Sequence, residues 1–260
     1  MPATPARALG GPGVELRPVT PADVDWLYGL LVHDQGLRWR YRGRTPSPAT
    51  FATDLWHGVH SQYVAWGGGN ERQGIVGLFN ANQIASHCHF FAVAAPGGEL
   101  VTVRAGGLLI DWAFSDLGFD KLWIEAPEFN LQQFESLRRI ADVEGHLKDF
   151  DYWRGRYWAM YILSIQRERW VDSGLRDLTL RSQRRRVPAV AGGFSHRELK
   201  EFLSELWPID SLGAVELMQT LEDRLGDVVE STLIESAAGA ASPDAAATFI
   251  IDAIGSKIDG

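Results

Sequence analysis

The segment Leu108–Glu125, LLIDWAFSDLGFDKLWIE, decides the fold of this 260-residue chain. Apolar residues recur at helical spacing from Leu100 onward, and Leu117-Gly118 ends that pattern. The run Lys121–Glu125 then predicts a short buried strand that follows the helix directly. A helix that leads straight into a strand is typical of α/β proteins, so we expect a sheet covered by helices.

The residues before this segment predict a strand, two helices and three more strands. Glu15–Val19 alternates as a strand does, and Thr20 followed by Pro21 marks the start of a helix that runs to about Val32. A second helix is expected from about Pro48. Turns rich in Gly and Asn separate the three strands, which are expected at Ser61–Trp66, Gly74–Asn80 and Ile84–Val93.

The residues after it predict one more helix, at Leu131–Ala141, and a hairpin of two strands, His146–Tyr152 and Arg156–Gln166. The order of elements indicates an α/β domain with a mixed sheet over residues 15–175. We expect residues 1–14 to be a disordered segment, 176–193 to be a linker rich in Arg, Pro and Gly, and 194–260 to be a separate helical domain.

Composition excludes several classes of protein. Hydrophobic residues make up 45% and charged residues 22%, as in soluble globular domains. No apolar run is long enough for a membrane helix, and the first residues lack the apolar core of a secretory signal. The single cysteine, Cys88, excludes an internal disulfide framework and a cysteine-based zinc site. We therefore expect a cytoplasmic protein without a membrane partner.

The net charge of −8 is concentrated in the last quarter of the chain. Residues 194–260 carry four Lys and Arg against thirteen Asp and Glu, a net charge of −9, so the remainder carries +1. This asymmetry suggests two units with different partners. It argues against nucleic acid as the partner of the C-terminal unit, because phosphates require a basic surface. The linker arginines Arg181 and Arg184–Arg186 are expected to dock on acidic surface and to release it at high salt.

Three stretches resemble the GNAT (Gcn5-related N-acetyltransferase) superfamily, and in particular its branch that acetylates ribosomal-protein N-termini and small amines. They are ELRPVTPADVDWLYGLL from Glu15, FFAVAAPGGELVTVRAGGLLIDWAFSDLGFDKLWIEAPEFN from Phe90, and DYWRGRYWAMYILSIQRERW from Asp151. The resemblance implies the GNAT fold, with a mixed central sheet flanked by helices. It also implies transfer of an acyl group from a thioester to an amine.

In that family an Arg/Gln-x-x-Gly-x-Gly/Ala loop before a helix turns backbone N–H groups toward the diphosphate of acyl-CoA. The matching stretch here begins at Pro96. Gly97 and Gly98 remain, but Leu100 replaces the later glycine and Glu99 places a carboxylate beside the diphosphate. The resemblance therefore implies a loop that holds a pantetheine arm while gripping the CoA nucleotide poorly. The same residues also fit an ordinary turn before a helix.

The base that deprotonates the amine is commonly a Glu on the strand that His87 occupies here. Strand alternation places His87, His89 and Phe91 on one face, and a histidine titrates near neutrality, so His87 is the candidate base. Either histidine is equally compatible with a hydrogen-bonded core position. Two histidines without nearby carboxylates do not indicate a metal site.

Three further residues have roles implied by the GNAT resemblance. Asn130 matches an Asn that contacts the pantetheine or fixes its loop. Tyr157 and Tyr161 on the last strand are candidates for the acid that protonates the departing thiolate. Packing is the alternative role for each tyrosine.

The acidic C-terminal unit contains IDSLGAVELMQTLEDRLG from Ile209 to Gly226, which resembles the second helix of acyl and peptidyl carrier proteins. The resemblance implies that Ser211 carries a covalent 4′-phosphopantetheine arm. It also implies two partners, a phosphopantetheinyl transferase and an acyl- or aminoacyl-loading enzyme. An amphipathic helix that begins with an N-cap serine is the alternative.

The unit departs from the carrier pattern in its length. Only Ser195–Leu206 is available as a first helix, and Trp207-Pro208 precedes the motif, with later helices expected at Leu233–Ala240 and Pro243–Ile254. A domain this small is marginal alone, so we expect it to pack on the GNAT domain.

Together the two resemblances predict an N-acyltransferase of specialised metabolism. It would transfer an acyl or aminoacyl group between the thioester on Ser211 and a small-molecule amine, and free acyl-CoA is a further candidate donor. Two alternatives stay open, a non-catalytic carrier and docking module, and an ordinary acetyl-CoA-dependent acetyltransferase with a structural tail.

Overall fold

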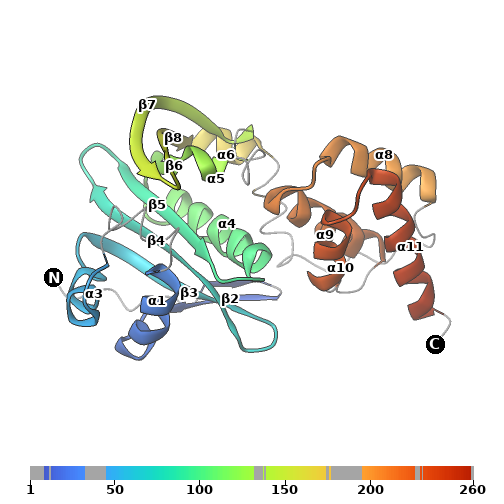
Figure 1. The fold of residues 1–260 in the computed structure, drawn as a ribbon, viewed down its shortest axis with the longest axis horizontal. Helices are drawn as coiled ribbons and strands as arrows, with labels where there is room; N and C mark the ends of the chain where they lie inside the picture. Colours follow the sequence, from blue (N-terminus) through green and yellow to red (C-terminus); the bar gives the residue numbers. More distant parts are fainter. Residues whose placement is uncertain are drawn as a thin grey trace.

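The computed structural model describes residues 9–258 apart from 12, 33–44, 132–136, 138, 174–175, 177–194, 226–228 and 230. The described residues form a sheet with helices on both faces, here called the sheet unit, and a group of helices beside it, the helical unit, His196–Ile258 (Figure 1).

The sheet has eight strands in the order β1-β2-β3-β4-β5-β6-β8-β7. Neighbours are antiparallel except β5 and β6, which are parallel. A parallel pair requires a crossover, and helix α4 (Glu99–Ser115) provides it. The strands are β1 (Leu9–Gly11), β2 (Val14–Pro18), β3 (Val59–Gly67), β4 (Arg72–Asn82), β5 (His87–Ala94), β6 (Lys121–Pro127), β7 (Ala141–Trp153) and β8 (Arg156–Gln166).

Helix α4 covers one face of the sheet, while α1 (Val24–Leu31) and α3 (Pro48–Asp54) cover the other. A short 3-10 turn at Pro21–Asp23 precedes α1. The alternation of β5 divides its side chains between the two cores, because Cys88 packs on the α4 side and Phe91 on the α1 and α3 side. The sequence predicted this division correctly.

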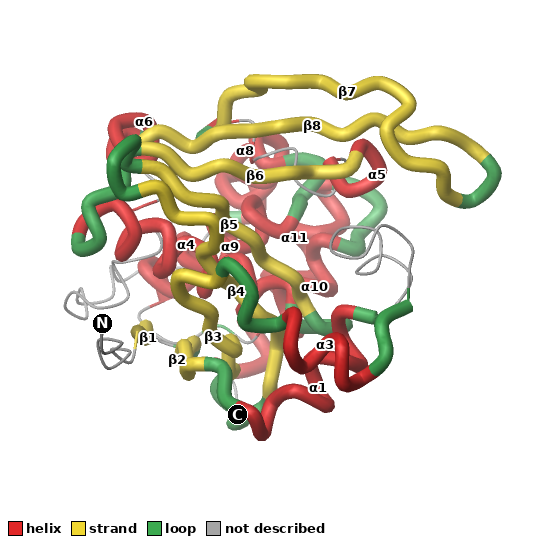
Figure 2. Tube along the Cα trace, turned by 90° about the vertical axis from the view of Figure 1, so that its left-hand side faces the viewer, coloured by secondary structure: helices red, strands yellow, loops and turns green. Residues whose placement is uncertain are grey.

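Strands β7 and β8 form a hairpin that extends past the ends of the other strands (Figure 2). Most side chains of β7 are exposed. The short helix α5 (Glu128–Leu131) follows β6, and α6 (Arg167–Asp172) follows β8. No helix in the described part of the chain combines the length and apolarity that a membrane span requires.

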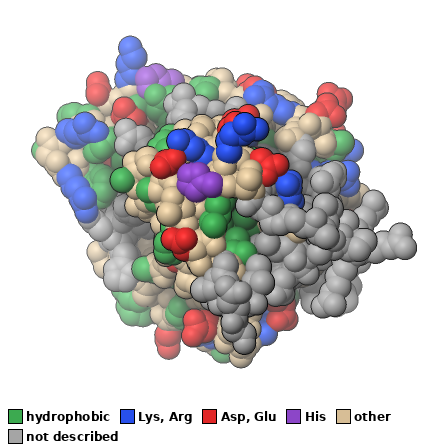
Figure 3. All heavy atoms as spheres, turned by 90° about the vertical axis from the view of Figure 1, so that its right-hand side faces the viewer, with side chains coloured by type: hydrophobic (Ala, Val, Ile, Leu, Met, Phe, Trp, Pro, Cys, Tyr) green, Lys and Arg blue, Asp and Glu red, His purple; other side chains and the backbone are tan. Residues whose placement is uncertain are grey.

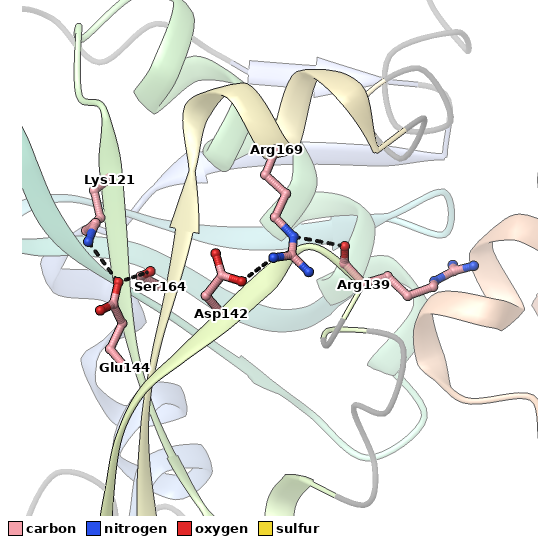
Figure 4. A network of polar contacts seen from close by, with 6 residues as sticks. All are labelled: Lys121, Arg139, Asp142, Glu144, Ser164 and Arg169. Atoms are coloured by element: carbon pink, nitrogen blue, oxygen red, sulfur yellow. Dashed lines mark hydrogen bonds and ion pairs between the residues drawn. The ribbon is translucent and has the colours of Figure 1, made fainter.

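A network of polar contacts holds the start of β7 against its neighbours (Figure 4). Glu144 accepts hydrogen bonds from Lys121 Nζ at 2.8 Å and from Ser164 Oγ at 2.7 Å. Arg169 of α6 pairs with Asp142 and donates to the carbonyl of Arg139 at 3.2 Å. The side chain of Arg139 itself points away from this network toward the helical unit.

The structure differs from the sequence predictions at several places in the sheet unit, and the short helices α5 and α6 are among the unpredicted elements. Leu9–Gly11, within the segment expected to be disordered, forms β1 against β2. Strand β5 begins at His87 rather than Ile84, because the Ala85 N–H is held by the Asn82 side chain in a turn. Ala141, expected at the end of a helix, begins β7. The rest of that expected helix falls largely outside the described residues, as do residues 177–193 of the linker with Arg181 and Arg184–Arg186.

The helical unit consists of four described helices, α8 (His196–Leu206), α9 (Ser211–Leu225), α10 (Ser231–Ala238) and α11 (Pro243–Ile258), which match the predicted helices closely. Ser195 and Glu198 form a capping box that fixes the start of α8. The helices bury a common apolar core that includes Leu199, Leu203, Leu217, Leu221, Ile234 and Ile250.

Acidic residues of the helical unit are partly neutralised by the few basic ones. Lys200 pairs with Asp244 at 2.6 Å and Arg224 with Glu198 at 3.6 Å. On the face that lies to the right in Figure 1, described acidic and basic side chains are interspersed (Figure 3). That face is therefore of mixed sign where the structure describes it.

Candidate active site

The two parallel strands of the sheet stop pairing halfway along their length. β5 and β6 pair at His87–Lys121, Cys88–Leu122 and His89–Trp123, after which β5 continues to Ala94 and β6 to Pro127. Strands that part in this way expose main-chain N–H and C=O groups along their facing edges. His89 occupies the last paired position, and His87 lies two residues earlier.

His87 and His89 lie on the face of the sheet that α1 and α3 cover. The His87 ring meets Trp123 edge to face, and the His89 ring packs against Phe79. Among the described side chains, Nδ1 of each histidine is buried without a hydrogen-bond partner. A buried nitrogen without a hydrogen-bond partner raises the free energy of the folded protein, and a substrate that supplies the missing hydrogen bond would lower it again.

Burial lowers the pKa of His89, Glu125 opposes this effect, and the neighbouring His87 adds to it. His89 is consequently neutral at pH 7, the form in which it can accept a proton. Glu125 belongs to β6 and has the same parity as Trp123, so it lies on the histidine face just beyond the end of pairing.

Glu125 was missed by the sequence reasoning, which searched only the strand of His87 for titratable groups. Glu125 could have been identified from the parallel register of β5 and β6. A carboxylate two residues after a position opposite His89 must share its face.

The structure does not bring Tyr157 and Tyr161 to the histidines. Tyr161 pairs with Ala126 and packs against the core on the α4 face, with its ring stacked on His146. Tyr157 is 60% exposed in the β7–β8 hairpin, where its ring meets Tyr152. Their acid role stays a prediction from the resemblance, which these positions do not support.

The glycine loop before α4 is built around the carbonyl of Gln73 on β4. The Ala95 N–H donates to this oxygen at 2.8 Å and Thr102 Oγ1 donates to it at 3.0 Å. A Cβ on Gly98 would stand 2.1 Å from the same oxygen, so only glycine permits this approach. Gly97 has φ of +77°, a conformation that glycine adopts without strain. Gly98 is therefore needed for packing and Gly97 for its backbone conformation, whatever they bind.

The first turn of α4 is covered by the helical unit. Leu100 is 4% exposed and belongs to the apolar core of the helical unit, and Val103 packs against that core. A cleft of about 210 Å³ lies between the units, lined by apolar residues together with Glu99, Asp210 and Glu235. A diphosphate placed here would lie near acidic residues of both units, which disfavours a CoA nucleotide.

Helix α9 begins at this cleft. The Asp210 carboxylate accepts from the Gly213 N–H at 2.8 Å, and its carbonyl accepts from the Ala214 N–H at 2.8 Å, which fixes the N-terminal turn. Ser211 follows directly as the first residue of α9. Asn130 lies apart from this cleft, in α5 just after β6 ends. In the described part of the chain, no group of three metal-ligating side chains is placed to hold an ion.

Comparisons with known proteins agree with this architecture. No family model matches the chain, and no curated protein matches its sequence. Among solved structures, the Vibrio cholerae spermidine N-acetyltransferase in complex with CoA and spermine is similar, with a TM-score of 0.52 and 16% identity over 62% of this chain and 99% of that one. A chimera of this enzyme with hSSAT has a TM-score of 0.52 and 17% sequence identity, and a point mutant of the enzyme has a TM-score of 0.52 and 16% identity. The sheet unit thus has the fold of the GNAT N-acetyltransferases.

Proposed function

We propose that this chain is an N-acyltransferase of specialised metabolism whose donor is a thioester on its own helical unit. The arm is 4′-phosphopantetheine on Ser211, and the acceptor is an amine. The observation that carries the proposal is the position of α9. This helix begins at the cleft beside the first turn of α4, and α4 belongs to the unit that has the GNAT fold. The segment that resembles a carrier motif therefore begins beside the unit with the acyltransferase fold, which supports the proposal.

The neighbours support the reaction class. They are N-acetyltransferases, and one is described as a complex with CoA and spermine, an amine. We infer an amine acceptor here as well, bound on the histidine face of the sheet. The partner proteins implied by the carrier motif are a phosphopantetheinyl transferase and an acyl- or aminoacyl-loading enzyme.

The chain's own residues have the following roles in the proposal. The arm supplies an acyl group activated as a thioester. The facing edges of β5 and β6 beyond His89 offer main-chain groups that can pair with the amides of the arm, as an added strand would. Gly97 and Gly98 are proposed to contact the arm near its entry, and Asn130, in α5 after β6, farther along it. A base on the histidine face then takes the proton that the amine loses.

The sequence favoured His87 as that base, by its match to the family position. The geometry favours His89, because it lies where the strands part and because burial keeps it neutral. We propose His89 as the base and His87 as the residue to compare with it. For the acid, Tyr157 and Tyr161 are carried over from the resemblance alone, because both lie away from the histidines.

The test is the intact mass of the full chain after incubation with CoA and a promiscuous phosphopantetheinyl transferase. We expect the protein to gain one phosphopantetheinyl group and Ser211→Ala to gain none. Ser195→Ala is the matched control, since Ser195 also stands at a helix start in the same unit. Wild-type protein that stays unmodified with several transferases would remove the carrier function.

An ordinary acetyl-CoA-dependent N-acetyltransferase with a structural tail is the second candidate. The CoA complex of a similar structure favours it. Micromolar affinity for acetyl-CoA, and full turnover of acetyl-CoA by Ser211→Ala, would decide for this candidate. A non-catalytic docking module would be indicated if the loaded protein transferred nothing to any amine.

A further inference from the structure

The helical unit is fixed to the sheet unit by an apolar contact at the start of α4. Leu100 is almost fully buried in the core of the helical unit, and Val103, one turn later, packs against the same core. Leu100 stands where the related loop has its later glycine. The residue that replaces the glycine of the related loop is therefore also the one that anchors the helical unit.

Two arginines of the sheet unit add polar contacts to α9. Arg104, 7% exposed, donates to Met218 Sδ at 3.5 Å; burial lowers its pKa, and the charge of Glu222 opposes this effect. Arg139 pairs with Glu216 at 2.5 Å. The contact thus has three parts. Leu100 and Val103 pack against the core of the helical unit, Arg104 is buried against α9, and the half-exposed Arg139 forms an ion pair with α9.

The cleft at this contact has acidic residues on both sides. Glu99 comes from the sheet unit, whereas Asp210 and Glu235 come from the helical unit, so docking adds two acidic residues beside the first turn of α4. CoA carries a diphosphate and a further phosphate on its nucleotide. A phosphopantetheine arm on a serine carries a single phosphodiester charge and no nucleotide, so the same carboxylates oppose it far less.

We propose that the docked helical unit closes the first turn of α4 to free CoA and reserves the parted strands for the arm on Ser211 of the same chain. Transfer then occurs within one molecule, and the docked contact selects the donor. Ser211 directly follows Asp210, a lining residue of the cleft, so an arm attached there starts close to the first turn of α4. Because the arm is tethered at this point, its effective concentration at the sheet unit is high, and binding of the CoA nucleotide is not needed to hold the donor. The second half of this inference rests on the proposed function, whereas exclusion of CoA does not.

The first experiment measures CoA binding to the unloaded full chain by calorimetry. Val103→Gln with Arg139→Glu weakens the apolar contact and opposes Glu216 with a like charge. We expect this double variant to bind CoA about tenfold tighter or more than wild type, within the range usual for coupling between sites. The variant is more negative than wild type, so added positive charge cannot explain a gain.

Two controls accompany this measurement. Arg17→Glu makes the same charge change at an exposed pair on β2, and it should leave CoA binding unchanged. Hydrogen exchange at Leu100–Arg104 reports whether the helical unit has been released. Release without tighter CoA binding would overturn the proposal. If CoA slowed hydrogen exchange of these amides in wild-type protein, where the helical unit is docked, the proposal would be overturned as well. That outcome does not depend on whether the variant releases the helical unit.

The second experiment follows single-turnover transfer from Ser211-loaded protein to spermidine as the probe amine. Transfer within one molecule predicts a rate constant that does not change with protein concentration. A rate constant that rises in proportion to concentration would overturn transfer within the chain. Failure to load Ser211, or absence of any transfer, would instead count against the proposed function and leave the CoA result standing.

Discussion

His87 and His89 share one strand face and differ in their distance from the point where β5 and β6 part. In the proposed reaction the amine binds beyond the last paired residues, and His89 lies nearer to that point than His87 does. Reasoning from sequence could place both on one face, because strand alternation fixes that. The resemblance ranked His87 first, whereas the ranking by geometry depends on where pairing with a distant strand ends.

Replacing His89 should therefore have the larger effect on catalysis. We expect His89→Gln to lower the single-turnover rate by about 10²- to 10⁴-fold, the usual contribution of a positioned base. His87→Gln is the matched control and should keep most of the rate. Equal loss in both variants, or none in His89→Gln, would contradict the assignment.

The pH dependence follows from the lowered pKa of His89. The base acts in its neutral form, so the rate should fall only as pH drops through a pKa below the usual value of about 6.5. Glu125 opposes the lowering by stabilising the protonated ring. Glu125→Gln should therefore shift the acid side of the rate profile to lower pH, and a shift to higher pH would show that Glu125 acts otherwise.

At the scale of elements, most of the sheet unit could be predicted from local pattern. The closing strand Arg156–Gln166 was predicted with the bounds that the structure shows, because the turn at Arg154-Gly155 marks its start. Strand β1 was missed, since Leu9–Gly11 has no pattern of its own and forms only by pairing with β2. The helix expected before β7 was predicted to end at Ala141, which was wrong for the same reason. Ala141 is in a strand because it pairs with Ile165 of β8.

The loop between β5 and α4 depends on one glycine for its packing. A Cβ on Gly98 would overlap the Gln73 carbonyl, which is already held by Ala95 and Thr102. We expect Gly98→Ala to destabilise the fold by about 1–3 kcal/mol, as overpacking does, in urea unfolding monitored by circular dichroism.

The control for this substitution is Gly68→Ala in the β3–β4 turn, where an added Cβ meets nothing within 4 Å. That variant should change the free energy of unfolding by less than about 0.5 kcal/mol. Similar values for the two variants would mean that α4 shifts freely on β4.

At the scale of the whole molecule, sequence predicted two units and their contact but not where they meet. The charge asymmetry pointed to the linker arginines as the ionic link. The ionic contact that the structure describes joins Arg139 to Glu216, and the apolar one centres on Leu100. Neither could be read locally, since each joins residues separated by more than seventy positions.

The position of Leu100 predicts how the two units share their stability. Although it belongs to α4, its side chain completes the core of the helical unit, whereas Leu109 on the same helix is buried in the core of the sheet unit. Leu100→Ala should cost about 2–5 kcal/mol, as cavities in cores do, and speed hydrogen exchange in α10 and α11 while leaving β3 and β4 protected. Leu109→Ala should do the reverse. If each variant loosened both units equally, the two cores would unfold as one, and the helical unit could not release α4 without unfolding the sheet.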